Sequence, residues 1–154
     1  MFSTLASYLL APLFVFGVYH LLTWIDVMRI NARPAWKRVA IASGVSHILL
    51  ATGFFVFAYL EAAGADYGPF LFNRTAFWRM ATIFDIAPML VILAGFSLLD
   101  RLGISPPGVL FLTVAIIYAV GTLQWFLVGG ALGAILEKFW EGLKTPEPED
   151  DQWL

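Results

Sequence analysis

Hydrophobic residues form four long runs that fill most of the chain, and short polar segments separate them. The runs cover residues 5–25, 39–60, 80–99 and 109–136. A helix crosses a hydrocarbon core of about 30 Å with about 20 residues, so each run is long enough to span a membrane. Strands of a membrane barrel would instead alternate over segments of about ten residues. We therefore expect an all-α fold, a four-helix transmembrane bundle with up-down-up-down topology.

The segments between the runs set the domain organisation. The first connection, residues 26–38, is basic and contains Pro34, which prevents a continuous helix. The second connection, residues 61–79, is rich in Gly, Phe and Trp, and we expect it to lie in the membrane interface. The last residues, 146–154, are acidic and are predicted to be a disordered tail. Residues 1–145 then make up one transmembrane helical domain.

Composition supports the membrane class and excludes several kinds of chemistry. The chain is 60% hydrophobic and 13% charged, whereas soluble domains carry about 25% charged residues. It contains no cysteine, which excludes disulfides, thiolate metal sites and cysteine nucleophiles. The net charge is −2 and no basic fold is evident, so nucleic acid is not an expected partner. The lipid bilayer is the expected partner.

Two histidines within the hydrophobic runs are candidate cofactor ligands. His20 and His47 stand symmetrically about the first connection, so an antiparallel hairpin places them at similar depth. Facing histidines are the arrangement that axial ligation of haem b, or binding of another pigment, requires. The simpler interpretation, which we favour, is that each histidine is neutral and hydrogen-bonded between helices, without a cofactor.

Asp85 is the only acid within the runs, and it is predicted to lie a turn or two from Arg79 at the end opposite the basic connection. A carboxylate inside a membrane must be paired, hydrated or protonated, so it is a candidate functional residue. Tyr8 and Gln124 are expected at comparable depth on other helices. This polar cluster would bind a proton or cation, or it would hold the helices together.

The fourth run contains a spacing of small residues typical of close helix contacts. Gly129 and Gly133 lie one turn apart and would let a neighbouring backbone approach closely. The neighbour would be another helix of the same bundle, another membrane subunit or a second copy of the chain.

No catalytic or metal-binding signature stands out, and we do not expect an enzyme. The leading hypothesis is a non-enzymatic accessory or scaffold subunit of a membrane complex. The second is a haem- or pigment-binding electron-transfer subunit based on His20 and His47. The third is a small proton- or cation-coupled transporter based on Asp85.

The density of basic residues in the first connection predicts the orientation. Arg29, Arg33, Lys37 and Arg38 crowd one short loop, which the positive-inside rule places in the cytoplasm. Both termini then lie outside, in what we expect to be a prokaryotic cytoplasmic membrane. Reporter fusions within residues 31–35 and after Leu154 should report cytoplasmic and external locations respectively. A cytoplasmic signal from the fusion after Leu154 would contradict this orientation.

Overall fold

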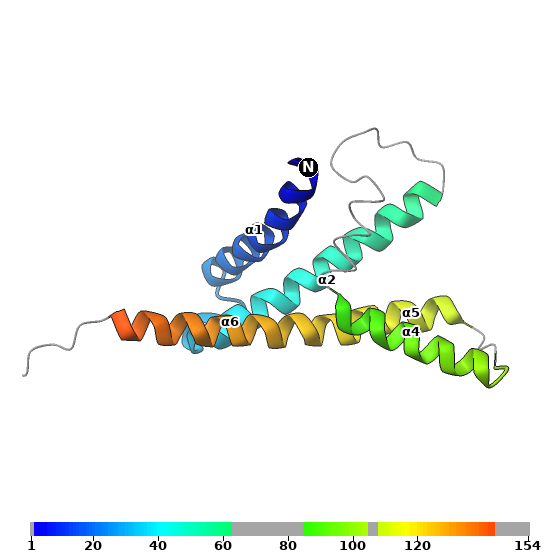
Figure 1. Ribbon diagram of the computed structural model, residues 1–154. Helices are drawn as coiled ribbons and strands as arrows, with labels where there is room; N and C mark the ends of the chain where they lie inside the picture. The colour runs from blue at the N-terminus through cyan, green and yellow to red at the C-terminus, as the bar shows by residue number, and fades with distance from the viewer. Residues whose placement is uncertain (1, 63–84, 105–107, 144–154) are drawn as a thin grey trace, which may run out of the picture.

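The computed structural model describes residues 2–62, 85–104 and 108–143, with the side chains of residues 2–10, 28, 57–62 and 110 outside this description. Every regular element in the described residues is a helix, which confirms the predicted all-α class. The elements in Figure 1 are α1 (Phe2–Trp24), the 3₁₀-helix η1 (Val27–Ala32), α2 (Ala35–Ala62), α4 (Ile86–Arg101), α5 (Val109–Ile116), the π-helix η2 (Ile117–Gly121) and α6 (Thr122–Leu143).

Two of the described helices are long and apolar enough to cross a membrane. They cover Ala35–Val56 within α2 and Phe111–Leu143 along α5, η2 and α6, and Ala11–Trp24 of α1 is a shorter apolar helix. The hydrophobic pattern predicts four spans. The predicted third span, residues 80–99, differs most from the helix in the structure. The corresponding helix, α4, begins at Ile86 and has 16 residues. Residues 63–84 and the predicted tail, residues 146–154, lie outside the described residues.

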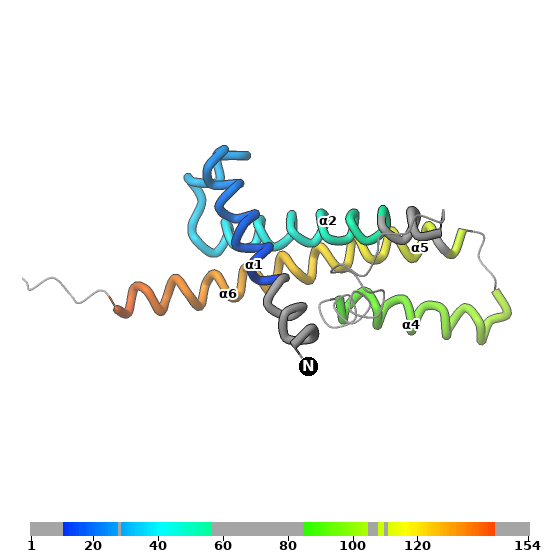
Figure 2. Tube along the Cα trace, turned by 90° about the horizontal axis from the view of Figure 1, so that it is seen from above, coloured from blue at the N-terminus to red at the C-terminus, as the bar shows by residue number. Residues whose placement is uncertain are grey.

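An antiparallel pair of helices, α2 and α6, is the centre of the fold, and Figure 2 shows the two running side by side. Trp36 lies against Gly133, and further along α2 His47 lies against Thr122. Small residues meet across this interface: Gly44 lies against Thr122, and Ala40 lies against Gly130. Close approach of the two backbones gains dispersion contacts, which hold the two helices together.

The helices α1 and α2 form a hairpin, and one residue of the loop between them, Ile30, is buried between the two helices. Ile30 of η1 is 1% exposed and packs with Val18 and Leu22 of α1 and Ala42 of α2. Asn31 fixes the loop, because its backbone N–H donates to Asp26 Oδ1 (3.1 Å) and its side-chain amide donates to the carbonyl of Thr23 (2.8 Å). The second bond occupies one of the carbonyls left free at the end of α1.

The other helices extend from the α2–α6 pair without completing a compact bundle. α4 packs beside α5 and η2, whereas α1 contacts α2 and η1 and diverges from α6 in Figure 1. The hydrophobic pattern predicts one uninterrupted helix over residues 109–136. The structure instead places a π-helical turn between α5 and α6, and α6 continues to Leu143.

Replacement of Gly133 by Ala tests the packing of α2 against α6. A Cβ atom there would lie 2.7 Å from Trp36 Cα and 3.0 Å from Val39 Cβ, so the helices must separate. We expect Gly133→Ala to lower the free energy of unfolding by roughly 1–3 kcal/mol, the usual cost of overpacking. Gly95→Ala on α4 is the matched control, because its Cβ would meet nothing within 4 Å. Unfolding in detergent micelles measures both, and equal stability of the two variants would contradict the proposed packing.

Candidate functional site

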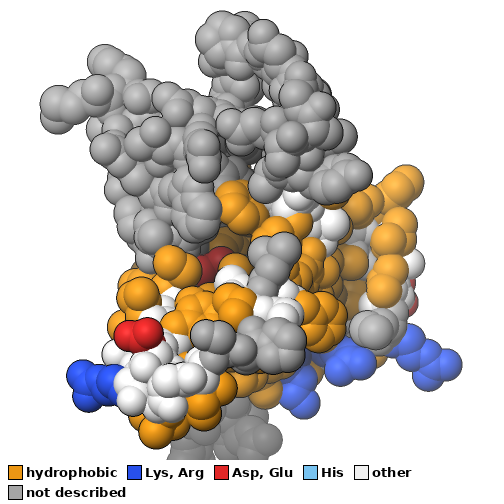
Figure 3. Space-filling view, turned by 90° about the vertical axis from the view of Figure 1, so that its right-hand side faces the viewer, with side chains coloured by type: hydrophobic (Ala, Val, Ile, Leu, Met, Phe, Trp, Pro, Cys, Tyr) orange, Lys and Arg blue, Asp and Glu red, His pale blue; other side chains and the backbone are white. Residues whose placement is uncertain are grey.

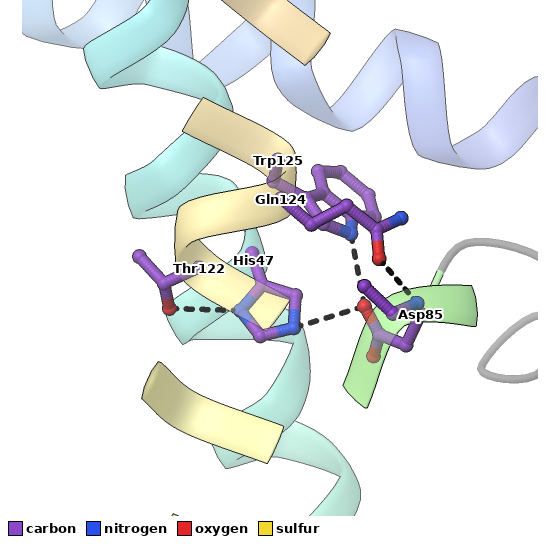
Figure 4. A network of polar contacts seen from close by, with 6 residues as sticks. His47, Asp85, Thr122, Gln124 and Trp125 are labelled. Carbon is purple, nitrogen blue, oxygen red and sulfur yellow. Dashed lines mark hydrogen bonds and ion pairs between the residues drawn. The ribbon is translucent and has the colours of Figure 1, made fainter. Parts of the chain in front are cut away.

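Three helical segments bring a buried histidine and a carboxylate together (Figure 4). His47 of α2 is 2% exposed, and Asp85, which directly precedes α4, has a side chain 15% exposed. His47 Nε2 lies 3.1 Å from Asp85 Oδ1. The same carboxylate oxygen accepts a hydrogen bond of 3.0 Å from Trp125 Nε1 of α6. Asp85 therefore faces a histidine of α2 and an N–H donor of α6.

Both ring nitrogens of His47 face a protein partner, with different geometries. Nδ1 lies 3.0 Å from Thr122 Oγ1, where the tautomer of the ring decides which atom donates. Nε2 is close enough to Asp85 for an ion pair but lies outside the geometry of a hydrogen bond. The Nε2 contact with Asp85 is therefore mainly electrostatic, and a small movement of Asp85 would align or break it.

The first turn of α4 positions Asp85. Its backbone occupies the N-cap position of α4, but its side chain makes no capping bond because it points toward His47 and Trp125. Gln124 of α6 supplies the missing acceptor: its Oε1 accepts a 2.8 Å hydrogen bond from the backbone N–H of Ala87.

Gly121 makes room for the histidine ring at the last residue of η2. An added Cβ atom would lie 2.5 Å from His47 Nε2 and 3.4 Å from Asp85 Oδ1. The ring therefore lies directly against the backbone of the π-helical turn. Single π-helical turns within α-helices occur frequently at functional sites, since they alter the direction in which side chains project.

A second polar pair lies further along the same interface. Thr52 Oγ1 of α2 and Tyr118 Oη of η2 are 2.8 Å apart, and the ring of Tyr118 stacks on Phe55. Thr52 is exposed, whereas His47 is buried. The polar groups between α2 and α6 thus extend from the buried site toward the surface of the protein.

The structure brings some of the predicted site residues together and separates others. Asp85 and Gln124 meet at the start of α4, whereas the side chain of Tyr8 lies outside the described residues. Gly129 and Gly133 lie within the α2–α6 contact, where Gly129 leaves room for Ser43.

The two histidines lie in different surroundings. The side chain of His20 is exposed on α1, with its ring against Phe16 and Tyr19. An axial ligand must present a ring nitrogen to the haem iron, so ligation by His47 would require its contacts with Thr122 and Asp85 to open. Haem binding stays a prediction. In the described part of the chain, no group of three metal-ligating side chains comes together.

The contact between His47 and Asp85 was not predicted, because the hydrophobic pattern places the two residues toward opposite ends of the bundle. His47 lies 12 residues after the start of α2 and 15 before its end, near the middle. Asp85 reaches the same level because α4 begins beside the middle of α2 and not at one end of it. The sequence did contain one signal for this contact. Ionisable groups are rare in the hydrophobic runs, and buried charges tend to pair with one another.

No protein-family model matches this chain, and comparisons with curated proteins and with solved structures also find no match.

Thr122→Val tests the hydrogen bond to His47, because valine keeps the shape of threonine and removes only the hydroxyl. The loss of this bond should lower the free energy of unfolding by about 0.6 to about 1.7 kcal/mol, the range for hydrogen bonds between membrane helices. Thr113→Val on α5 is the control, since the Thr113 hydroxyl bonds only locally to the carbonyl of Val109 in the described structure. Equal unfolding midpoints for the two variants in detergent would show that the Thr122 hydroxyl does not support the site.

Proposed function

We propose that this protein is a small integral membrane protein with four spans, whose His47–Asp85 pair binds and releases a proton in a proton-coupled process. The observation that supports this function is the 3.1 Å contact between the two side chains in the interior of an apolar helix pair. Imidazole and carboxylate groups exchange protons readily, and ionisable pairs inside membranes mark proton and ion pathways.

The position of the pair supports coupling to movement. His47 lies near the middle of α2, where α4 begins. Transporters commonly place their binding sites near the membrane midplane, at the N-terminal ends of helices that start there. Here the group at the N-terminal end of α4 is a carboxylate of the chain itself, so a proton is the simplest ligand.

Protonation would change how α4 attaches to the α2–α6 pair. The ionised Asp85 carboxylate attracts a protonated His47 and accepts the hydrogen bond from Trp125. A proton on the carboxylate removes the charge and weakens both contacts, because hydrogen bonds to ionised groups are about twice as strong as those between neutral groups. Proton uptake would therefore release the start of α4, and proton loss would restore its attachment.

An accessory or scaffold subunit is the second candidate, and the surface of α6 favours it. Exposed large apolar side chains continue along this helix to its end: Leu123, Leu127, Leu132, Ile135, Phe139 and Trp140. Figure 3 shows hydrophobic side chains across much of the described surface. Lipid or the helix of another membrane subunit would cover this face of α6. In that role the His47–Asp85 pair only holds the helices together.

Nuclear magnetic resonance of the labelled histidines tests the proton site directly. The chain contains two histidines, so His20→Gln leaves His47 as the one source of imidazole signals. Asp85→Asn should change the ring-nitrogen chemical shifts of His47, because an amide cannot exchange a proton with the imidazole in contact with it. The protein should stay folded, since asparagine keeps the shape of the side chain.

The same variant separates the two candidate functions in a deletion strain. If the pair carries protons, Asp85→Asn should fail to complement despite normal expression and stability. Asp100→Asn removes an exposed acid from α4, the helix that follows Asp85, and should complement. Unchanged ring-nitrogen chemical shifts of His47 in the folded Asp85→Asn variant would reject the proton site. Full complementation by Asp85→Asn would favour the accessory role.

A further inference from the structure

A cluster of basic residues lies around the start of α2, far along the helix from the buried pair. Arg29, Arg33 and Lys37 are exposed and Arg38 is half-buried. Asp26 is the acid of this segment, and its Oδ1 already accepts the N–H of Asn31. Segment 26–38 therefore carries four basic groups against one acid, an excess of three positive charges.

The end of α6 reaches the same region without cancelling this charge. Gly133 packs against Trp36, and the charged residues that follow on α6 are Glu137, Lys138 and Glu141. These add one net negative charge. Within the described residues this region keeps an excess of two positive charges, which attracts an anion.

Arg38 carries a buried donor that lacks an acceptor within the described residues. Its Nε atom is shielded from solvent and makes no hydrogen bond there. A buried guanidinium N–H without a partner costs free energy, and it is normally satisfied by a carboxylate, a carbonyl or a phosphate. Arg38 therefore has a donor that the described residues leave unused.

The surroundings of the basic cluster are those of a membrane–water interface. Trp24 is 83% exposed and Ile25 is 51% exposed at the end of α1, and Trp36 is 37% exposed at the start of α2. The ammonium group of Lys37 lies 5.2 Å from the centre of the Trp36 ring. Exposed Trp beside Lys and Arg is typical of the level at which lipid headgroups lie. Figure 3 shows several Lys and Arg side chains grouped along one edge, next to hydrophobic ones.

We propose that Arg38, with Lys37 beside it, binds the phosphate of an anionic phospholipid. The Arg38 guanidinium donates to a phosphate oxygen after its side chain turns toward the headgroup, since its Nε atom is shielded from solvent in this structure. The remaining basic residues of segment 26–38 attract the negative headgroup. The exposed apolar and tryptophan side chains next to the cluster would contact the acyl chains. This apolar surface favours a lipid over a soluble phosphate, which would gain nothing from it.

Lipid binding to the delipidated full chain in detergent tests the proposal. Phosphatidylglycerol should bind and raise the unfolding midpoint, whereas phosphatidylcholine and inorganic phosphate should not. Arg38→Gln should weaken phosphatidylglycerol binding roughly fivefold, which corresponds to about 1 kcal/mol for one basic group at a membrane surface. Arg101→Gln, which removes an exposed arginine from the end of α4, should leave binding unchanged.

Three other outcomes would overturn the proposal. Equal weakening by Arg101→Gln would indicate a general charge effect without a site, and an equal response to inorganic phosphate would indicate a soluble anion. Unchanged binding by Arg38→Gln would exclude Arg38 as the ligand. If Arg38→Gln does not fold, Arg38→Lys replaces it, because lysine keeps the charge and lacks the Nε donor. Arg38→Lys should also weaken binding, and full binding by this variant would reject the specific role of the guanidinium.

Discussion

The contact between His47 and Asp85 is the interaction on which the arrangement of three helical segments depends. A carboxylate in apolar surroundings must be neutralised or paired, and this requirement fixes α4 against α2 at one level. Other features at the site follow from the same contact. Gly121 leaves room for the histidine ring, and Gln124 satisfies the start of α4 because the Asp85 side chain is engaged elsewhere.

Packing and polar contacts contribute to this fold in different ways. The α2–α6 pair is held by many close contacts between small residues, each weak but large in sum. A hydrogen bond between membrane helices contributes only about 0.6 kcal/mol on average. The polar cluster therefore adds little to the total stability. Its main physical effect is to favour the observed position of α4, where Asp85 contacts His47 and Trp125.

The two proposed roles, lipid binding and proton binding, belong to two polar regions at different levels of α2. Arg38 lies at the basic end and His47 lies nine residues further along, which corresponds to about 14 Å of helix. In the proposed roles, the basic end binds an anionic headgroup and the interior pair binds a proton. Because one straight helix carries both residues, binding at the headgroup level would fix the depth of the histidine in the membrane.

The sequence by itself determined the helical class, the approximate helix positions and the few ionisable residues that required an explanation. Continuous apolar runs leave helices as the consistent choice, and that inference needs no knowledge of tertiary contacts. The partner of Asp85 depended on tertiary structure, because it required the start of α4, the π-helical turn and the register of α2 against α6 together. Hydrophobicity reports which residues avoid water and is almost uniform along these helices. It therefore carries no information on the rotation and relative shift that bring His47, Asp85 and Trp125 to one point.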